Sequence, residues 1–270
     1  MKNLKDIIKC AAFDIDGTIL PNGNTKFSEK TIELFSLLKK NNIVSILATA
    51  REFSTIGDFL EQLKPDYFIG ANGSFILDCN KNEMIYEIGM NLNEVKKLYD
   101  EFYSDDCNFI ITDINKSYYS ENTNLDTWFI RPNISKYDKL DFNKIIDNRI
   151  YVITLSGNEI SKKVDLIDKF IKDNDLDMEI NSTWSRGIFI GPKNITKSST
   201  LKLLTRKIGF SNDNLIAFGD SSNDFEMIRD AVYGVAMERA SWKIKNIATD
   251  ITLDCEYDGA YLKLKELKLI

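Results

Sequence analysis

Apolar runs alternate with amphipathic segments along the first 70 residues of the chain. The run over 7–13 predicts a buried strand that ends at Asp14. A helical pattern follows, with Ser28 as its N-cap and an end near residues 41–42. The pattern predicts three further elements here: a strand over 43–48, a helix over about 52–63 and a strand over 67–70.

The same alternation of apolar and amphipathic segments returns late in the chain, with a helix predicted over about 197–208 and strands over 215–218 and 233–237. Apolar strands separated by helices favour an α/β fold with a doubly wound, Rossmann-like parallel sheet. Between these parts, period-two segments and more aromatic residues indicate an inserted α+β domain with helices near 93–104 and 159–172. We therefore predict a core made of 1–82 and 190–270, and an inserted domain over 83–189.

Composition narrows the classes of function. The chain has 270 residues, is 43% hydrophobic and carries a net charge of −6, which favours a folded protein without general nucleic-acid affinity. Histidine is absent, so Ser-His-Asp and Cys-His catalysis are excluded. The four cysteines show no paired spacing, and neither a signal pattern nor a run of membrane-spanning length is present. A cytoplasmic protein is the expectation.

The most informative motif is Asp14-Ile15-Asp16-Gly17-Thr18, directly after the first predicted strand. Carboxylates at i and i+2 of an extended segment point to the same side and repel each other unless a cation lies between them. Such a pair at a strand end suggests a magnesium site with a nucleophile and a proton donor. Taken alone, the two residues could equally cap a turn.

Four motifs in chain order resemble those of the haloacid dehalogenase (HAD) superfamily, and within it the Cof-type sugar phosphatase-like hydrolases. They are 14–18, Ala48-Thr49-Ala50-Arg51, Lys197, and Gly219-Asp220-Ser221-Ser222-Asn223-Asp224. Segments 71–73 and 258–260 also resemble Cof-type signatures. The resemblance spans nearly the whole chain and implies a Rossmann-like core with an inserted cap domain.

The resemblance assigns roles around a Mg²⁺ ion. Asp14 would attack phosphorus and form an aspartyl-phosphate, while Asp16 would act as general acid and then base. Asp14, Asp220 and the backbone carbonyl of Asp16 would bind the metal. Asp224 would lie behind them, fixing a metal-bound water or Lys197.

The resemblance also assigns the phosphate-binding groups. They are expected at Thr49, Ala50, Arg51, Lys197 and Asn223. Three of them have a structural alternative: Thr49 could be a helix N-cap, Lys197 a solvated lysine, and Arg51 one half of a surface ion pair.

The chain departs from the Cof-type pattern in three places. Ala50 stands where glycine is common, Ser198 follows Lys197 in place of glycine, and Glu238-Arg239 replaces the familiar Gly-Asn. The last change alters the charge beside the site. In the cap, expected to close over the site, candidates for substrate selection are Trp184, Ser185 and Arg186, placed in a loop before the return to the core.

The leading function is a magnesium-dependent phosphatase acting on small phosphate monoesters, with sugar phosphates favoured. Two alternatives remain open: a phosphomutase on the same core, and a non-catalytic phosphate-responsive module similar to a receiver domain. The physiological substrate, the pathway and the oligomeric state are not specified by the sequence.

Overall fold

The structure is a computed structural model that describes residues 3–128, 130–184 and 186–270. The chain forms two compact units. The core unit comprises the chain up to Ala50, Asp58–Ile85 and Lys197–Ile270, and the second unit comprises Arg51–Gly57 and Tyr86–Thr196. The predicted limits, 1–82 with 190–270 and 83–189, stay predictions, because compactness does not show that either part folds alone.

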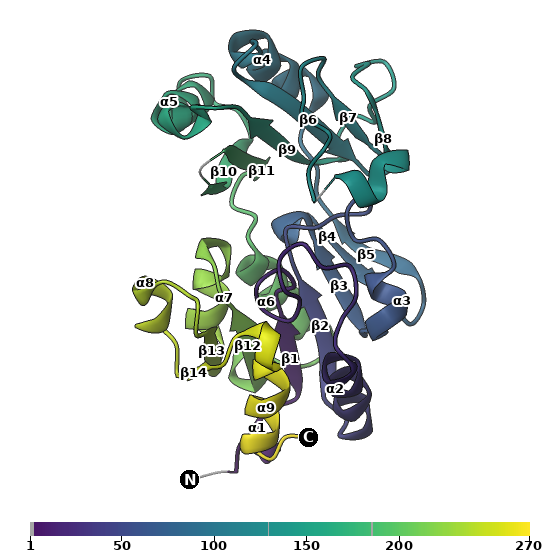
Figure 1. The fold of residues 1–270 in the computed structure, drawn as a ribbon, viewed down its shortest axis with the longest axis vertical. Helices are drawn as coiled ribbons and strands as arrows, with labels where there is room; N and C mark the ends of the chain where they lie inside the picture. Colours follow the sequence, from purple (N-terminus) through teal and green to yellow (C-terminus); the bar gives the residue numbers. More distant parts are fainter. Residues whose placement is uncertain (1–2, 129, 185) are drawn as a thin grey trace. The chain divides into compact units, whose positions relative to one another are not determined.

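The core unit is built on an eight-stranded sheet in the order β14-β13-β12-β1-β2-β3-β4-β5 (Figure 1). Its strands are β1 (Cys10–Phe13), β2 (Val44–Ala48), β3 (Tyr67–Gly70), β4 (Phe75–Asp78), β5 (Glu83–Glu87), β12 (Leu215–Gly219), β13 (Tyr233–Met237) and β14 (Asp250–Thr252). The pairings from β14 to β3 are parallel, and β4 runs antiparallel to β3. Every residue of β1 and β12 is buried, as expected for strands covered on both faces. The predicted parallel α/β core is confirmed.

The direction of chain travel reverses beside β1. From β1 the chain proceeds through β2 to β3 on one side, and from β12 through β13 to β14 on the other. Because parallel crossovers are right-handed, helices connecting strands on the two sides cover opposite faces of the sheet. Ligands of such sheets bind at the carboxyl ends of the strands where this reversal occurs. Here that point lies between β1 and β12.

The helices of the core unit include those predicted after Ser28 and over about 197–208. The core-unit helices are α1 (Leu4–Ile7), α2 (Glu29–Lys40), α3 (Phe59–Leu63), α6 (Lys197–Lys207), α7 (Phe225–Asp230), α8 (Trp242–Lys245) and α9 (Gly259–Glu266). Ser28 caps α2 as predicted, since its side chain accepts a hydrogen bond from the backbone N–H of Thr31.

The helix predicted over 52–63 is wrong in its first half. Only α3, at its end, is helical. The Glu52 carboxylate accepts hydrogen bonds from the Ser54 N–H and the Thr55 hydroxyl, and Gly57 has a φ of 56°. Local side-chain bonds of this kind compete with helical ones, and a positive φ is incompatible with a right-handed helix.

The second unit contains a six-stranded sheet in the order β10-β11-β9-β6-β7-β8 (Figure 1). The strands are β6 (Asn108–Asp113), β7 (Ser117–Tyr119), β8 (Tyr137–Lys139), β9 (Ile150–Ser156), β10 (Met178–Trp184) and β11 (Gly187–Pro192). All pairings are antiparallel except that of β7 with β8. Apolar residues of α4 (Leu92–Phe102) and α5 (Val164–Asp173) share a buried cluster with these strands. The two predicted helices and the α+β character are confirmed.

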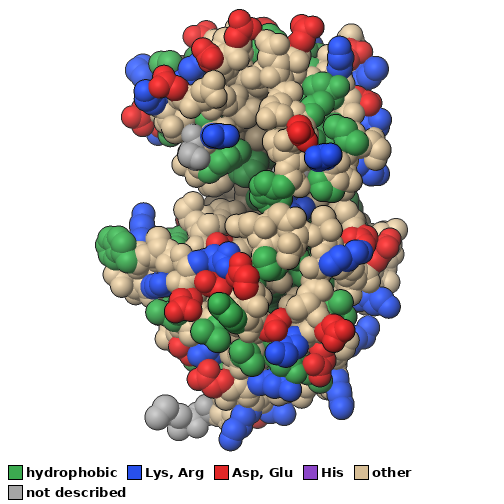
Figure 2. All heavy atoms as spheres, viewed as in Figure 1, with side chains coloured by type: hydrophobic (Ala, Val, Ile, Leu, Met, Phe, Trp, Pro, Cys, Tyr) green, Lys and Arg blue, Asp and Glu red, His purple; other side chains and the backbone are tan. Residues whose placement is uncertain are grey.

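Charged side chains of both signs are interspersed on the face of the molecule shown in Figure 2. This mixture agrees with the even distribution of acidic and basic residues along the sequence. Among the described residues, none of the helices combines the length and the apolar character that crossing a membrane requires.

Candidate active site

Four strand ends of the core sheet bring the candidate residues to one edge. Phe13 of β1 is in register with Phe218 of β12, and the N–H of Asp14 donates to the carbonyl of Phe218 over 3.1 Å. On the other side of β1, the Thr49 N–H donates to Ile69, and the Asn72 N–H donates to the Thr49 carbonyl, both over 3.0 Å. Residues that follow β1, β2, β3 and β12 are thus neighbours at the edge where doubly wound sheets bind ligands.

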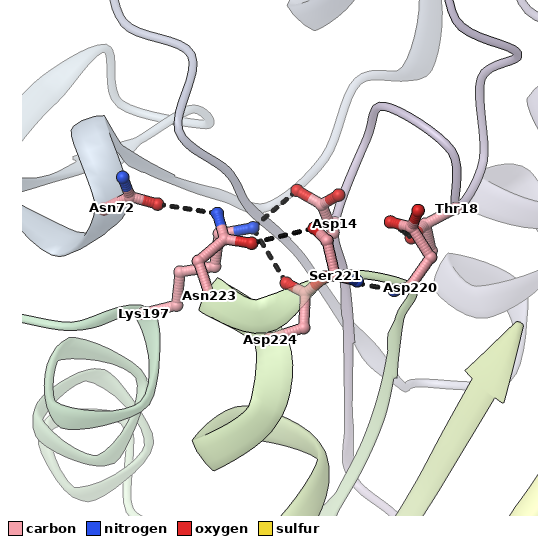
Figure 3. A network of polar contacts seen from close by, with 8 residues as sticks. All are labelled: Asp14, Thr18, Asn72, Lys197, Asp220, Ser221, Asn223 and Asp224. Carbon is pink, nitrogen blue, oxygen red and sulfur yellow. Dashed lines mark hydrogen bonds and ion pairs between the residues drawn. The ribbon is translucent and has the colours of Figure 1, made fainter. Parts of the chain in front are cut away.

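A buried lysine joins two of the carboxylates. The Nζ of Lys197 donates to Oδ1 of Asp14 over 2.6 Å and to Oδ1 of Asp224 over 2.8 Å (Figure 3). The lysine side chain is fully buried, as is that of Asp224. The surface-lysine alternative for Lys197 therefore fails, and a buried ion-paired cation lies directly beside Asp14.

Asp224 anchors the loop after β12. Its Oδ2 accepts hydrogen bonds from the backbone N–H groups of Asp220 and Ser221 over 3.0 and 3.1 Å, while its Oδ1 binds Lys197. Both oxygens are thus already engaged by protein donors. This favours the expected role of Asp224, which is to hold Lys197 or a metal-bound water in place and not to bind the metal directly.

Asp220 is held against the first loop by two features. The hydroxyl of Thr18 donates to its Oδ1 over 3.2 Å (Figure 3). Gly17 allows the close approach, because a Cβ at that position would lie 2.5 Å from Oδ2 of Asp220. The sequence marked Thr18 as part of the first motif but assigned it no role; the structure makes it an orienting partner of Asp220.

Three carboxylates share this small volume with one ammonium group. Carboxylate oxygens of Asp14, Asp220 and Asp224 lie within 4.8 Å of one another. Burial and the nearby Asp224 charge raise the pKa of Asp220 to about 7, although Lys197 opposes this shift. Burial also raises the pKa of Asp14 well above its usual range, against the opposing charge of Lys197. Burial would lower the pKa of Lys197, but the charges of Asp14 and Asp224 outweigh it, so the lysine stays protonated.

These pKa directions fit the presence of a divalent cation site. Three carboxylates here lie close to one ammonium group, and burial raises the pKa values of both Asp14 and Asp220. Carboxylate oxygens are the ligands that Mg²⁺ prefers, and a divalent cation would offset the excess charge. Asp16 is half-buried and follows Asp14 on an otherwise buried loop, whose Gly17 N–H donates to the Leu20 carbonyl.

Replacing Gly17 by alanine tests the close approach to Asp220. We expect Gly17→Ala to shift the Asp220 carboxylate and to reduce the increase in Tm that Mg²⁺ produces. Gly23→Ala is the matched control, since Gly23 has a φ of 87° against 83° for Gly17, but beyond its chain neighbours no atom of the described residues lies within 4 Å of the place a Cβ would take there. Both variants should lose about 1 kcal/mol of stability from the positive φ. Equal Mg²⁺ responses in the two variants would contradict the role of Gly17.

The second motif, residues 48–51, is divided between the two compact units. Thr49 is buried at the end of β2, with Ala50 half-buried after it. Arg51 begins the segment that belongs to the second unit, where its Nη1 donates to the Thr55 carbonyl over 2.6 Å. Arg51 is buried, so an exposed ion pair is not its environment. Its predicted contact with phosphate remains a prediction.

Asn223 lies in the pocket but its amide nitrogen already has a partner. Its Nδ2 donates to Oδ1 of Asn72 over 2.9 Å, and its Oδ1 accepts from the Ser221 hydroxyl over 3.0 Å (Figure 3). Sequence reasoning noted Asn72 as part of a family signature without giving it a function. The family-like segment 71–73 was visible in the sequence. The contact of Asn72 with Asn223 was not, because it joins segments that only the fold brings together.

Of the specificity candidates that the structure describes, Trp184 lies in a strand, so its predicted placement in a loop is wrong. This residue ends β10, its ring 4.6 Å from that of Phe189, and a Cβ at Gly187 would collide with it. The strand pairs antiparallel with β11, and the register shifts between Ile180 and Ser182. Arg186 is exposed in the turn, and Ser185 lies outside the described residues.

Arg239, one of the residues that depart from the family pattern, is anchored within the core unit. Its guanidinium forms ion pairs with Asp254 and Glu256, and its N–H donates to Asp254 over 2.7 Å. Its charge also opposes the rise in the pKa of Asp220, behind the larger effects of burial and Asp224. Arg239 thus contributes an ion-paired guanidinium on the side of Asp220.

Comparison with known proteins identifies similar hydrolases. The profile of the haloacid dehalogenase-like hydrolases matches residues 11–264. The chain is 28% identical, over 91% of its length and 90% of the relative, to the 5-amino-6-(5-phospho-D-ribitylamino)uracil phosphatase YcsE of Bacillus subtilis. A second Bacillus subtilis protein with the same named activity, YitU, is 25% identical over 94% of this chain and 96% of its own.

Solved structures share the fold. A haloacid dehalogenase-like hydrolase from Bacteroides thetaiotaomicron superposes with a TM-score of 0.82 at 21% identity, covering 96% of this chain and 99% of that one. A sugar phosphatase of HAD subclass IIB gives a TM-score of 0.81 at 22% identity, covering 97% and 100%. At this level of identity the likeness concerns the fold.

Proposed function

Because the chain belongs to the haloacid dehalogenase-like hydrolase family, we propose that it is a magnesium-dependent phosphatase that hydrolyses small phosphate monoesters through a phosphorylated Asp14. Its reaction class is phosphoric monoester hydrolysis, in line with the family and the phosphatases among its relatives. The observation that carries the finer proposal is the buried pairing of Lys197 with Asp14 and Asp224, with Asp220 beside them.

Asp14 is the nucleophile of the proposal. Lys197 fixes one of its carboxylate oxygens over 2.6 Å, which restricts the rotation of the carboxylate at the strand end. Attack on phosphorus forms the Asp14–phosphate bond and breaks the bond to the leaving alkoxide. Asp16 gives a proton to that alkoxide and then removes one from the water that hydrolyses the phosphorylated Asp14. The protonated Lys197 offsets charge on the phosphoryl group during both transfers.

Mg²⁺ is the proposed cofactor, held by the Asp14 and Asp220 carboxylates and the Asp16 backbone carbonyl. When bound, the ion supplies positive charge that lets an anionic carboxylate approach an anionic phosphate. Thr18 and Asp224 serve this set indirectly, since Thr18 orients the Asp220 side chain and Asp224 fixes the Asp220 backbone. Thr49 and the neighbouring backbone complete the proposed phosphate site.

Sugar phosphates and sugar-alcohol phosphates are the proposed substrate class. Two relatives, YcsE and YitU, are named as phosphatases of a phosphorylated ribityl compound, which supports a polyhydroxyl leaving group. Selection by Trp184 and Arg186, and the assignment of the second unit as a cap, stay predictions. So does a cytoplasmic location, which the four free cysteines support.

Phosphate release from a panel of esters tests the proposal. The panel contains hexose phosphates, 5-amino-6-(5-phospho-D-ribitylamino)uracil and a phosphodiester as a negative control, each with Mg²⁺ and with a chelator. We expect Mg²⁺-dependent release of inorganic phosphate from monoesters alone. An isomerised ester in place of free phosphate would favour a phosphomutase, and a stable phosphoryl group on Asp14 without turnover would favour a phosphate-responsive module.

The pH dependence of Mg²⁺ binding provides a second test. Protons compete with the metal for Asp220, whose pKa is raised to about 7. Asp220 is therefore increasingly protonated below pH 7, and the increase in Tm on adding Mg²⁺ should be smaller at pH 6 than at pH 8. Asp220→Asn should show a small increase at both values. Equal increases at pH 6 and pH 8 in the unmodified protein would remove Asp220 from the proposed ligands.

A further inference from the structure

A side-chain amide beside the carboxylate cluster is buried without a hydrogen-bond partner in the described part of the chain. Asn72 is 3% exposed, and its Nδ2 is buried without a hydrogen-bond partner among the described residues. Burying an amide N–H unpaired costs free energy comparable to that of a lost hydrogen bond, so such groups are rare in native proteins. An unsatisfied donor at a ligand-binding edge therefore points to an acceptor that arrives with the ligand.

The orientation of this amide is set by its neighbours. The Ser221 hydroxyl donates to Oδ1 of Asn223, and Nδ2 of Asn223 donates to Oδ1 of Asn72. The oxygen of Asn72 is thereby engaged, and Figure 3 shows its nitrogen on the side away from Asn223. Hydrogen bonds in such a chain polarise one another, which strengthens the terminal donor.

The backbone at this position is also held in an uncommon conformation. Ala71 and Asn72 have φ values of 47° and 56°, and the Asn72 N–H donates to the Thr49 carbonyl. A left-handed conformation is unfavourable for alanine and tolerated by asparagine. Two successive residues in this conformation fix the backbone from which the Asn72 side chain projects. This backbone lies next to Thr49, the residue expected to hold phosphate.

We infer that Nδ2 of Asn72 donates a hydrogen bond to a non-bridging phosphoryl oxygen of the substrate, with Asn223 as the positioning residue behind it. This inference rests on the proposed phosphatase function of the same pocket. The donor that sequence reasoning assigned to Asn223 thus passes to Asn72, because Asn223 uses its amide nitrogen to orient Asn72. A charged acceptor makes this bond stronger than one between neutral groups.

Two substitutions at position 72 separate contact with phosphate from a purely structural role. Asn72→Asp keeps an oxygen that accepts from Asn223 and removes the donor, while Asn72→Gly suits the positive φ and removes the whole side chain. The matched controls are Asn212→Asp and Asn212→Gly, because Asn212 also carries a buried unpartnered amide atom among the described residues. Asn212 lies in the turn before β12, at the opposite end of that strand from Asp220.

The measurement is the affinity for inorganic phosphate in the presence of Mg²⁺, by calorimetry and as a competitive inhibition constant. We expect both position-72 variants to bind phosphate about 10- to 100-fold more weakly and to lose kcat/KM by a similar factor. The Asn212 variants should keep the phosphate affinity of the unmodified protein. Calorimetry needs no turnover, so failure to hydrolyse any ester would overturn the proposed function and leave the phosphate contact measurable.

Three results would overturn the inference. Retained phosphate affinity in Asn72→Asp, with loss only in Asn72→Gly, would show that Asn72 merely supports Asn223. An increased KM for esters with unchanged phosphate affinity would place the contact on the leaving group. Equal losses in the Asn72 and Asn212 variants would show a general effect on the fold.

Discussion

Asp14→Asn should abolish phosphate release, with kcat reduced by about 10⁴-fold or more, because the amide cannot attack phosphorus. The fold should remain intact. Burial of the Asp14 carboxylate raises its pKa because the charged form is costly to desolvate, and a neutral amide of the same shape removes that cost. Lys197 keeps Asp224 as a partner in the variant.

Phosphate release and thermal unfolding of the same preparations check this expectation. Asp6→Asn is the control, since Asp6 lies exposed in α1 and should tolerate the change in both assays. A residual rate in Asp14→Asn above about one per cent of wild type is far more than the expected loss allows and would contradict the assignment of Asp14 as nucleophile.

Lys197→Met should have the largest effect on stability as well as a severe effect on rate. Removing one partner of a buried ion pair leaves the other charge uncompensated, which costs about 3–5 kcal/mol, and here both Asp14 and Asp224 lose their partner. Loss of the charge that faces the transferring phosphoryl group should lower kcat by about 10²–10³-fold.

The sign of the pH dependence identifies the cause of that instability. Lys197 opposes the rise in the pKa of Asp14, so without the lysine this pKa rises further and the folded state binds protons more tightly than the unfolded chain does. The loss of unfolding free energy should therefore be larger at pH 8 than at pH 5.5, as measured by urea denaturation. Lys202→Met, at an exposed position of the same helix, serves as the control. A small, pH-independent loss equal to that of the control would contradict the account.

Much of the site follows from local sequence because strand ends are local features. Asp14 and Asp220 each follow a short, fully apolar run, and parallel strands place such ends on one edge of the sheet. Ser28 is similarly local, since an N-cap depends on its own first turn. These predictions needed no knowledge of which distant segments meet.

What the sequence left open depends on contacts between distant segments. The role of Thr18 requires Asp220 to lie against the first loop, and that of Asn72 requires Asn223 beside the end of β3. The helix predicted over 52–63 failed because the apolar periodicity there did not register the hydrogen bonds of the Glu52 side chain. Amphipathic spacing reports burial, and specific polar contacts override it.

The most direct test of the account is an acid-quenched single turnover with a hydrolysable phosphate monoester and Mg²⁺, followed by peptide mass spectrometry. The account predicts a transient phosphoryl group on the peptide that contains Asp14, appearing before free phosphate and absent from Asp14→Asn. Release of phosphate without any phosphorylated Asp14, and at an undiminished rate in the variant, would contradict it.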